Sequence, residues 1–490
     1  MSAETVQGLR RDAVGLREVL FQSVTAMAPA AAVAASIPSG AAFAGGSLPL
    51  SVLIALVACL FTASCVAELA RELPAAGSVA TYAAQGLHPA VGFLVGWGYV
   101  FVEALVPPLL LLQLGFTTAG TLHQEWSSYP ESLWWPWALA GAAIIAAAGW
   151  FGVRASARFG TVLGVFEILV FLVFAIWLIG KAGSANTLSV FGTSHTGKDY
   201  SGLGGVFAGS VYTVLAFAGF EAAAPLAEET RDPRRTMHRA ALGIGLFYVL
   251  TTYAMAVYFG PDRFAGFGAS GAASWEGVAR ASFGLFWVLV FLAVVNSTIA
   301  NANACATVST RTAFALARIR VLPRVLATLH PRHRSPVAGI AVQTVVAVGA
   351  VLGLGFGYDP VTAFLLLATV IVTVVIGVYI VVNLACAGYF LRRRRELLKP
   401  VRHLLVPLLG IVAFVPALLT AAGLPVFDFV TELTAPVSYA GPVVGVWMAA
   451  GVVVLLVLLR RHPERIAETA RVHLDELASS GLSQNGAVQP

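Results

Sequence analysis

Long apolar stretches are the feature that most limits how this chain can fold. Windows of about 20 apolar residues, the length at which a helix crosses a hydrocarbon core, recur along most of the sequence. Only 11% of the 490 residues are charged and 58% are hydrophobic, which is too little charge to solvate a globular surface. We therefore predict an all-α membrane protein with twelve transmembrane helices, at about residues 20–44, 48–70, 90–118, 134–152, 159–180, 203–230, 239–260, 283–310, 337–356, 361–391, 403–422 and 437–459.

Positive charge is distributed unevenly between the two sets of loops that these helices would define. Only Lys181, Lys198, Arg263 and Arg280 fall on one face, and the other 26 of the 30 cationic residues fall on the opposite face. Because cytoplasmic loops are enriched in Lys and Arg, this asymmetry predicts a multi-pass protein of the cytoplasmic (inner) membrane. Both termini are then cytoplasmic, and residues 181–201 face outside.

Two of the apolar stretches contain residues that disfavour a continuous helix. In the sixth stretch, Gly219 and Pro225 flank an acid, Glu221, and the first stretch carries Pro29 and Pro38. Such interruptions free backbone groups at membrane depth, where they persist only beside a protein-lined cavity. Paired interruptions in the two halves of a chain favour a transporter binding site. A kinked structural helix, with its acid bonded to a neighbouring helix, is the alternative.

Motifs around these interruptions resemble those of a known family. The first reads ELARELPAAGS at 68–78 with GFLVGW at 92–97, the second reads FAGFE at 217–221 with AEETRDPRR at 227–235, and the third reads ALAR at 315–318, LPR at 322–324 and HPR at 330–332. In this order, over about residues 20–460, they resemble the signature of the amino acid, polyamine and organocation (APC) permeases. The chain departs from that signature at Asp232, at 319–321, and at 29–31, where many members carry Gly-x-Gly.

The resemblance implies a leucine-transporter-type fold. A cytoplasmic segment at 1–19 would precede a transport core at 20–391, made of inverted 5+5 repeats at about 20–180 and 203–391 with helices 1 and 6 broken. Two peripheral helices at 392–460 and a partly disordered cytoplasmic tail at 461–490 would follow.

The resemblance also implies a secondary active transporter for an amino acid or related amine. It would work by alternating access and be driven by protons, with the substrate, protons and the lipid bilayer as its partners. An amino acid/amine exchanger, a polyamine carrier and a nontransporting membrane sensor remain alternatives.

In this geometry the free backbone groups of the two breaks bind the substrate. The N–H groups face a carboxylate and the freed carbonyl groups accept from an ammonium. The predicted substrate-binding residues are Ala28, Pro29, Ala30, Ala31, Phe217, Ala218, Gly219 and Phe220. Phe217 and Phe220 are lids over the substrate in this hypothesis, and packing residues in the alternative.

Acids within the apolar stretches are candidates for proton coupling or gating. Glu221 directly follows a break, at a depth where an ionised carboxylate is disfavoured. Glu103 and Glu167 are further candidates, each a proton relay or a buried structural acid, and Glu68 is expected at the membrane interface. Some proton-coupled relatives place a lysine in the fifth helix, and this chain has none there.

A pair of small polar residues in the eighth stretch suggests one further site. Ser297 and Thr298 match the Ser/Thr pair of sodium-coupled members, although such residues more often bond neighbouring helices.

Other classes of function lack support in the sequence. Cys59, Cys65, Cys305 and Cys386 all lie in apolar stretches and suggest neither a disulfide framework nor a metal site. The basic residues follow the loops, which argues against nucleic acid as a partner. The nine His are scattered, so an enzyme is not expected. Residues 192–199 imitate a phosphate-binding loop after a strand-like segment at 188–191, but end in Asp where Ser or Thr must bind magnesium. No cofactor and no metal are predicted.

Overall fold

The chain folds into long helices. The computed structural model describes residues 26–73, 78–151, 157–200, 202–221, 233–269, 274–318, 323–331, 333 and 335–468, and these ranges contain no strand. The α-helices that carry the fold are α5 (Leu48–Glu72), α6 (Ser78–Gly86), α7 (Pro89–Glu125), α8 (Trp135–Phe151), α9 (Ala157–Ala182), α10 (Leu203–Phe217), α11 (Pro233–Phe259), α12 (Trp275–Phe283), α13 (Phe286–Arg318), α14 (Val337–Tyr358), α15 (Pro360–Arg392), α16 (Val406–Ala422), α17 (Ala440–Arg461) and α18 (Pro463–Glu468).

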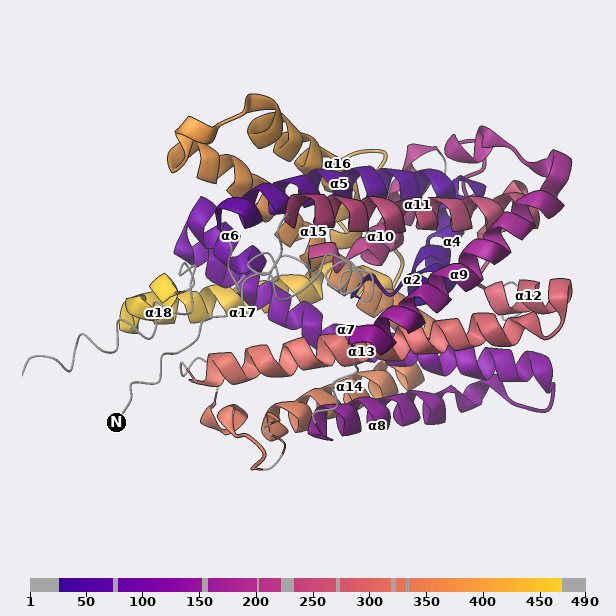
Figure 1. The fold of residues 1–490 in the computed structure, drawn as a ribbon, viewed down its shortest axis with the longest axis horizontal. Coiled ribbons are helices and arrows are strands. Elements are labelled where there is room, and N and C mark those ends of the chain that lie inside the picture. Colours follow the sequence, from indigo (N-terminus) through magenta and orange to yellow (C-terminus); the bar gives the residue numbers. More distant parts are fainter. Residues whose placement is uncertain are drawn as a thin grey trace, which may run out of the picture.

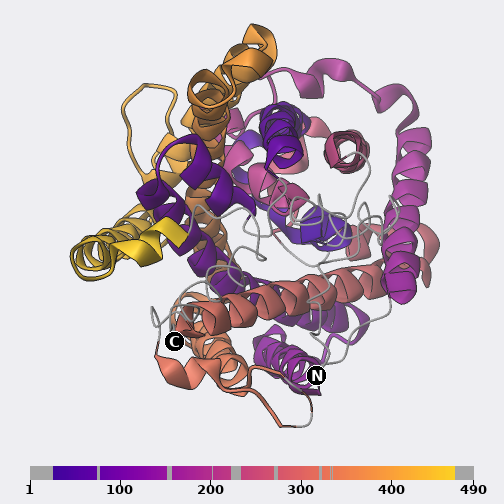
Figure 2. The same ribbon diagram turned by 60° about the vertical axis from the view of Figure 1, so that its left-hand side comes forward.

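Within the described ranges, ten helical segments are long and apolar enough to cross a membrane, and α10 is a shorter apolar helix. They lie side by side along the long axis of the molecule (Figure 1). α7 packs against α13 and α15, and α5 packs against α10 and α11. α8 and α14 pack together at the bottom of the turned view, whereas α17, in yellow, lies at its left edge (Figure 2).

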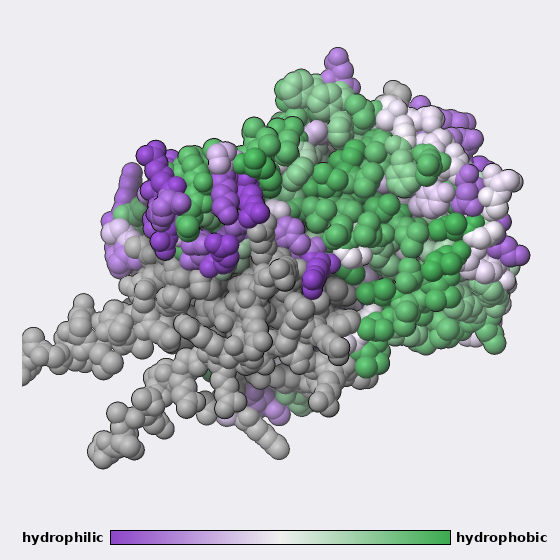
Figure 3. All heavy atoms as spheres, turned by 45° about the horizontal axis from the view of Figure 1, so that its top comes forward, coloured by the Kyte–Doolittle hydropathy of each residue, from purple (hydrophilic) through white to green (hydrophobic). Residues whose placement is uncertain are grey.

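The outer surface of the bundle suits lipid. A broad apolar area covers the middle of the molecule, and hydrophilic residues gather toward its ends (Figure 3). Val345 on α14 is 71% exposed and Val446 on α17 is 73% exposed, which would be costly in water over so large an area. The chain is a multi-pass membrane protein.

Local sequence explains where several helices begin. Asp359 precedes Pro360 and caps α15, because its Oδ1 accepts from the N–H groups of Val361 at 2.9 Å and Thr362 at 3.0 Å. Within α7, Pro107 and Pro108 lie inside a helix that continues through them. Neighbouring helices supply the packing that tolerates such prolines in a membrane.

Two tryptophans attach α17 to α7. The rings of Trp97 and Trp447 stack with centroids 4.8 Å apart. Each indole N–H donates to the other residue's backbone carbonyl, at 3.0 and 3.2 Å. Gly451 lets the helices approach, since a Cβ there would lie 2.5 Å from the Trp97 ring. This reciprocal contact is the indole clasp.

The two predicted interruptions are present, because the first apolar stretch folds as short helical pieces and α10 ends at Phe217. One local expectation needs correction. The segment Leu188–Phe191 is a 3-10 helix instead of a strand. Glu68 is buried, with His403 of the π-helix η11 (Val401–Leu405) 3.8 Å from its carboxylate. Pro225 lies outside the described residues.

Candidate functional site

The first break lies at Ala28. This residue has φ 44° and ψ 66°, in the left-handed region that costs an alanine roughly 1–2 kcal/mol. A short helix, α2 (Pro29–Ala31), follows, then the π-helix η1 (Ala32–Ser36) and the short helices α3 (Ile37–Ser39) and α4 (Ala41–Ala44). Pro29 at the first helical position has no N–H to satisfy, which explains why the chain restarts there.

Side chains of three other helices donate to carbonyl groups along this broken segment. Tyr248 Oη of α11 donates to the Met27 carbonyl at 3.0 Å, and Gln113 Nε2 of α7 donates to that of Ala31 at 2.8 Å. Trp275 Nε1 of α12 donates to the Val33 carbonyl at 2.9 Å. The first break is therefore held from outside, by neutral donors.

The second break follows α10. Ala218 leaves the helix with ψ 130°, and Gly219 has φ 109°, a conformation that strongly favours glycine. The Gly219 N–H donates to Glu221 Oε2 at 3.1 Å. The side chain two residues on thus caps a backbone group that the break has freed.

Two tyrosines complete the environment of Glu221. Tyr379 Oη of α15 donates to Oε2 at 2.8 Å, and Tyr99 Oη of α7 donates to Oε1 at 2.9 Å. The Glu221 side chain is only 3% exposed. Both oxygens of this buried acid are therefore hydrogen-bonded, as a carboxylate at this depth requires. We call Glu221, Tyr99 and Tyr379 the tyrosine clasp.

The two breaks touch one another. A Cβ at Gly219 would lie 2.8 Å from the Ala26 carbonyl oxygen, so only glycine fits against the first helix. Tyr248 reaches both breaks: its hydroxyl binds the Met27 carbonyl, and its ring packs edge-on against Phe217 with centroids 5.3 Å apart. Phe220 packs against Tyr379 of the clasp at 5.2 Å.

Each of the other two candidate acids lies near one break, Glu167 near the first and Glu103 near the second. Glu167 of α9 accepts from Asn296 Nδ2 of α13 and faces the Ala30 backbone N–H. Glu103 lies one helical turn from Tyr99 on α7, beside Cys305 of α13, and its Oε2 has no hydrogen-bond partner among the described residues.

The two residues proposed for sodium, Ser297 and Thr298, have different contacts. Thr298 Oγ1 donates to the Val294 carbonyl of its own helix at 2.7 Å, whereas Ser297 lies beside Glu167. Both side chains are buried. The Thr298 contact is the back-bonding common for hydroxyls in helices.

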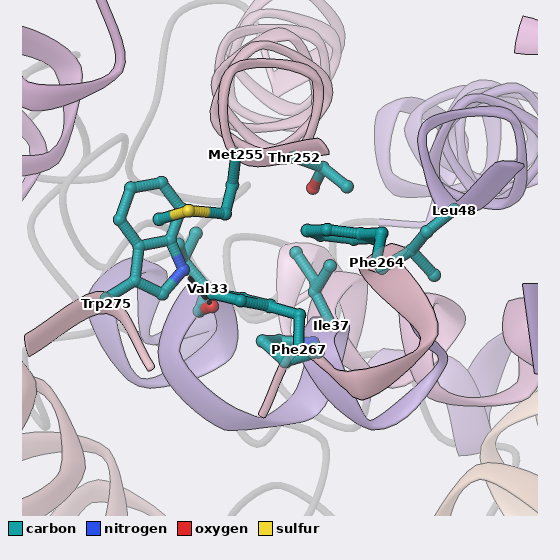
Figure 4. A pocket seen from close by; sticks show the side chains of 9 residues that line it. Val33, Ile37, Leu48, Thr252, Met255, Phe264, Phe267 and Trp275 are labelled. Atoms are coloured by element: carbon teal, nitrogen blue, oxygen red, sulfur yellow. Dashed lines mark hydrogen bonds between the residues drawn. The ribbon is translucent and has the colours of Figure 1, made fainter. Parts of the chain in front are cut away.

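A small pocket lies between the segment that follows the first break and α12. Val33, Ile37, Met255, Phe264, Phe267 and Trp275 are among the residues that line it (Figure 4). Its volume is about 10 Å³, the threshold for a single water. The pocket is therefore too small for an amino acid.

Comparison with known proteins shows the family of this chain. The sequence pattern of the amino acid permease family matches residues 18–465. The chain belongs to the amino acid permease family. The permease is therefore a membrane transporter for amino acids or related amines, as the motifs predicted.

Named relatives differ in what they carry. The permease is 28% identical over 382 residues to a low-affinity putrescine importer of Escherichia coli K12, covering 74% of this chain and 79% of that one. It is 24% identical to a branched-chain amino acid permease of Bacillus subtilis, over 70% of this chain and 75% of the relative. An uncharacterized transporter of Mycobacterium tuberculosis is 31% identical, over 69% of this chain and 73% of its own length.

A solved structure shares the fold. A manganese transporter of Eremococcus coleocola superposes with a TM-score of 0.51 at 11% identity, covering 96% of the permease and all of that chain. At this identity the likeness concerns the arrangement of helices alone.

Several residues of the site were not singled out in the sequence. Tyr99 carried a usable signal, because it lies four residues before Glu103 on one helical face. Tyr379, Tyr248 and Gln113 carried none, since each stands alone among apolar neighbours. Only the packing of separate helices shows that they reach the breaks.

Proposed function

We propose that the permease binds its substrate between the two breaks and carries it by alternating access. The observation that carries this proposal is the contact of Gly219 with Ala26, which brings together two broken helices far apart in sequence. Backbone groups at such breaks recognise charged substrate ends in transporters built from repeats. Residues 28–31 and 217–220 then form the site, in a leucine-transporter-type bundle of twelve membrane helices with 5+5 repeats and two peripheral helices.

The tyrosine clasp supports a role for protons. Glu221 lies next to the second break, and a proton on its carboxyl would compete with the hydrogen bonds from Gly219, Tyr99 and Tyr379. Loading or releasing that proton changes how firmly the break is held. In this proposal Glu221 couples protons to transport, with Glu103 and Glu167 as the next candidates.

An amine rather than an amino acid is the second candidate for the substrate. Among the described residues, none of Glu103, Glu167 and Glu221 forms an ion pair with Lys or Arg, so a cation would meet complementary charge. The likeness to a putrescine importer supports the same candidate. An exchange of amino acid for amine would use both the free backbone groups of the breaks and these buried acids.

Uptake into proteoliposomes tests these proposals together. Radiolabelled leucine, γ-aminobutyrate and putrescine, each with and without a pH gradient, separate amino acid from amine and coupled from uncoupled transport. Counterflow with loaded substrate detects exchange. Absence of uptake and counterflow for every amino acid and amine in the screen would instead favour a nontransporting sensor.

The orientation in the membrane has its own test. We propose the cytoplasmic membrane, with both termini in the cytoplasm and Lys198 outside, because of the distribution of cationic residues. A Lys198→Cys variant should react with an impermeant thiol reagent added to intact cells. Labelling only after the cells are opened would overturn this orientation.

A further inference from the structure

A buried acid at the start of α12 is not part of the proposed transport site. Ser274 caps this nine-residue helix, because its Oγ accepts from the Gly277 N–H at 3.1 Å. Glu276 follows in the first turn, where an acid normally interacts favourably with free N–H groups. It bonds its own backbone N–H and the Ser274 hydroxyl. Capping therefore explains part of its environment.

Capping leaves one oxygen unexplained. The Glu276 side chain is 3% exposed, and its Oε1 has no hydrogen-bond partner in the part of the chain that the structure describes. A surface cap would keep this oxygen in water. A buried carboxylate oxygen without a partner is costly and calls for a ligand or a proton.

The charged groups on the elements around α12 are engaged elsewhere or exposed. Arg280, one turn further along α12, pairs with Glu125 of α7 at 3.2 Å. On α13, no charged residue occurs before Arg311. In the preceding 3-10 segment η7 (Pro261–Gly266), Asp262 pairs with His195 at 2.8 Å and Arg263 is exposed. On α7, His123 bonds the Tyr129 carbonyl at 2.7 Å. On α9, Lys181 lies over the Trp177 ring and Glu167 accepts from Asn296. No described cation neutralises Glu276. Burial therefore raises its pKa, and the two capping hydrogen bonds only partly oppose this shift.

The residue before Glu276 connects α12 to the first break. Trp275 donates to the Val33 carbonyl and forms one wall of the closed pocket (Figure 4). Its ring also packs edge-on against Phe171 and Phe174 of α9, at 5.1 and 5.8 Å. A motion that lifts α12 off the first break would break the Trp275 hydrogen bond and carry the neighbouring Glu276 with it.

We propose that Glu276 is a second proton-binding site, which holds a proton while α12 closes over the first break and releases it when α12 lifts. A proton is the one cation that needs no cavity in the closed state. The closed state binds this proton more tightly than the open state. Acid pH on the side of the membrane that α12 faces therefore favours closure, and alkaline pH there favours opening. The site acts independently of Glu221 and of the identity of the substrate.

Accessibility of the pocket tests the proposal directly. Thr252 of α11 lines the pocket, so a Thr252→Cys variant reports opening through its reaction with an impermeant methanethiosulfonate reagent. Leu188 is 76% exposed, so a Leu188→Cys variant corrects for the effect of pH on thiol reactivity itself. Because a water-exposed Glu has a pKa of about 4.3, the corrected rate should rise roughly tenfold per pH unit from pH 5.5 up to the pKa of Glu276 in the closed state, and level off above it. In Glu276→Gln it should stay low and flat.

A matched control and the folding of the variant keep the test decisive. Glu131→Gln removes an exposed acid near the end of α7 and should keep the parent's pH profile. The same rise in Glu276→Gln as in the parent, or a flat profile in the parent, overturns the proposal. Loss of monodisperse protein in Glu276→Gln also overturns it, because the neutral side chain is the form assigned to the closed state.

Discussion

The two breaks meet in space but are held in different ways. At the first, three neutral donors, Tyr248, Gln113 and Trp275, bind carbonyl groups of the broken segment, and Glu167 faces the Ala30 N–H. At the second, the protein supplies an acceptor: Glu221 binds the freed N–H of Gly219. Neutral donors hold their partners equally at any pH near neutrality, whereas a carboxyl group accepts fewer hydrogen bonds once it is protonated.

The difference separates two tasks within one site. The first break is anchored to α7, α11 and α12, so its movement is tied to these helices. The second is anchored through a titratable group and two tyrosines, so its strength depends on a proton. The effects of substitutions at the two breaks should therefore differ in kind as well as in size.

The largest effect is expected where the breaks touch. Gly219→Leu places a side chain 2.8 Å from the Ala26 carbonyl at a φ that disfavours it, so substrate affinity should fall on the order of 100-fold while the protein stays folded. Gly349→Leu on α14 is the control, because a Cβ there meets nothing within 4 Å. Equilibrium binding to purified, monodisperse protein measures both. Unchanged affinity in Gly219→Leu would place the site elsewhere.

Neutralising the acid should remove the pH dependence of the second break. Glu221→Gln keeps the size and most hydrogen bonds of the side chain, so substrate exchange should remain while uptake between pH 5 and 8 becomes flat. Glu103→Gln and Glu167→Gln, measured in parallel, should keep the parent's profile. A profile unaltered in Glu221→Gln but lost in either of the others would move the coupling proton to that acid.

A pair of tyrosine substitutions contrasts the two breaks most directly. Tyr379→Phe removes a donor to ionised Glu221, so the midpoint of the uptake profile should move to higher pH by roughly 0.5 to 1 unit. Tyr248→Phe removes a donor to a neutral carbonyl and should cost about 1 kcal/mol of stability with the midpoint unchanged. Uptake profiles and thermal unfolding of both variants decide the point. Equal shifts in the two variants would erase the distinction between the breaks.

The smallest effect concerns sodium beside the first break. Because Thr298 bonds its own helix and the neighbouring Glu167 already accepts from Asn296, replacing sodium by choline should change uptake less than about twofold. Ser297→Ala should behave alike. A strong requirement for sodium that Ser297→Ala abolishes would assign the ion to this position.

The sequence predicts the multi-pass class, the family and the places where helices break, because these follow from local patterns. Gly219 and Pro29 interrupt apolar runs. In the structure Gly219 has a positive φ, and Pro29 directly follows Ala28, which also has one. The partners of the breaks do not follow from such patterns. Tyr99 and Tyr379 reach Glu221 across 122 and 158 residues, and which helices meet there is decided by packing over the whole bundle. The assignment of twelve helices in two repeats stays a prediction.

The indole clasp and the tyrosine clasp share one turn of α7. Trp97 lies two residues before Tyr99 on α7, and its stack with Trp447 fixes α7 to α17, whose outer face carries exposed valines such as Val446 and Val453. A bilayer thinner than the apolar belt favours tilting of its helices. A tilt of α17 would reach, through the paired indoles, the turn of α7 that carries Tyr99 and its hydrogen bond to the Glu221 carboxylate.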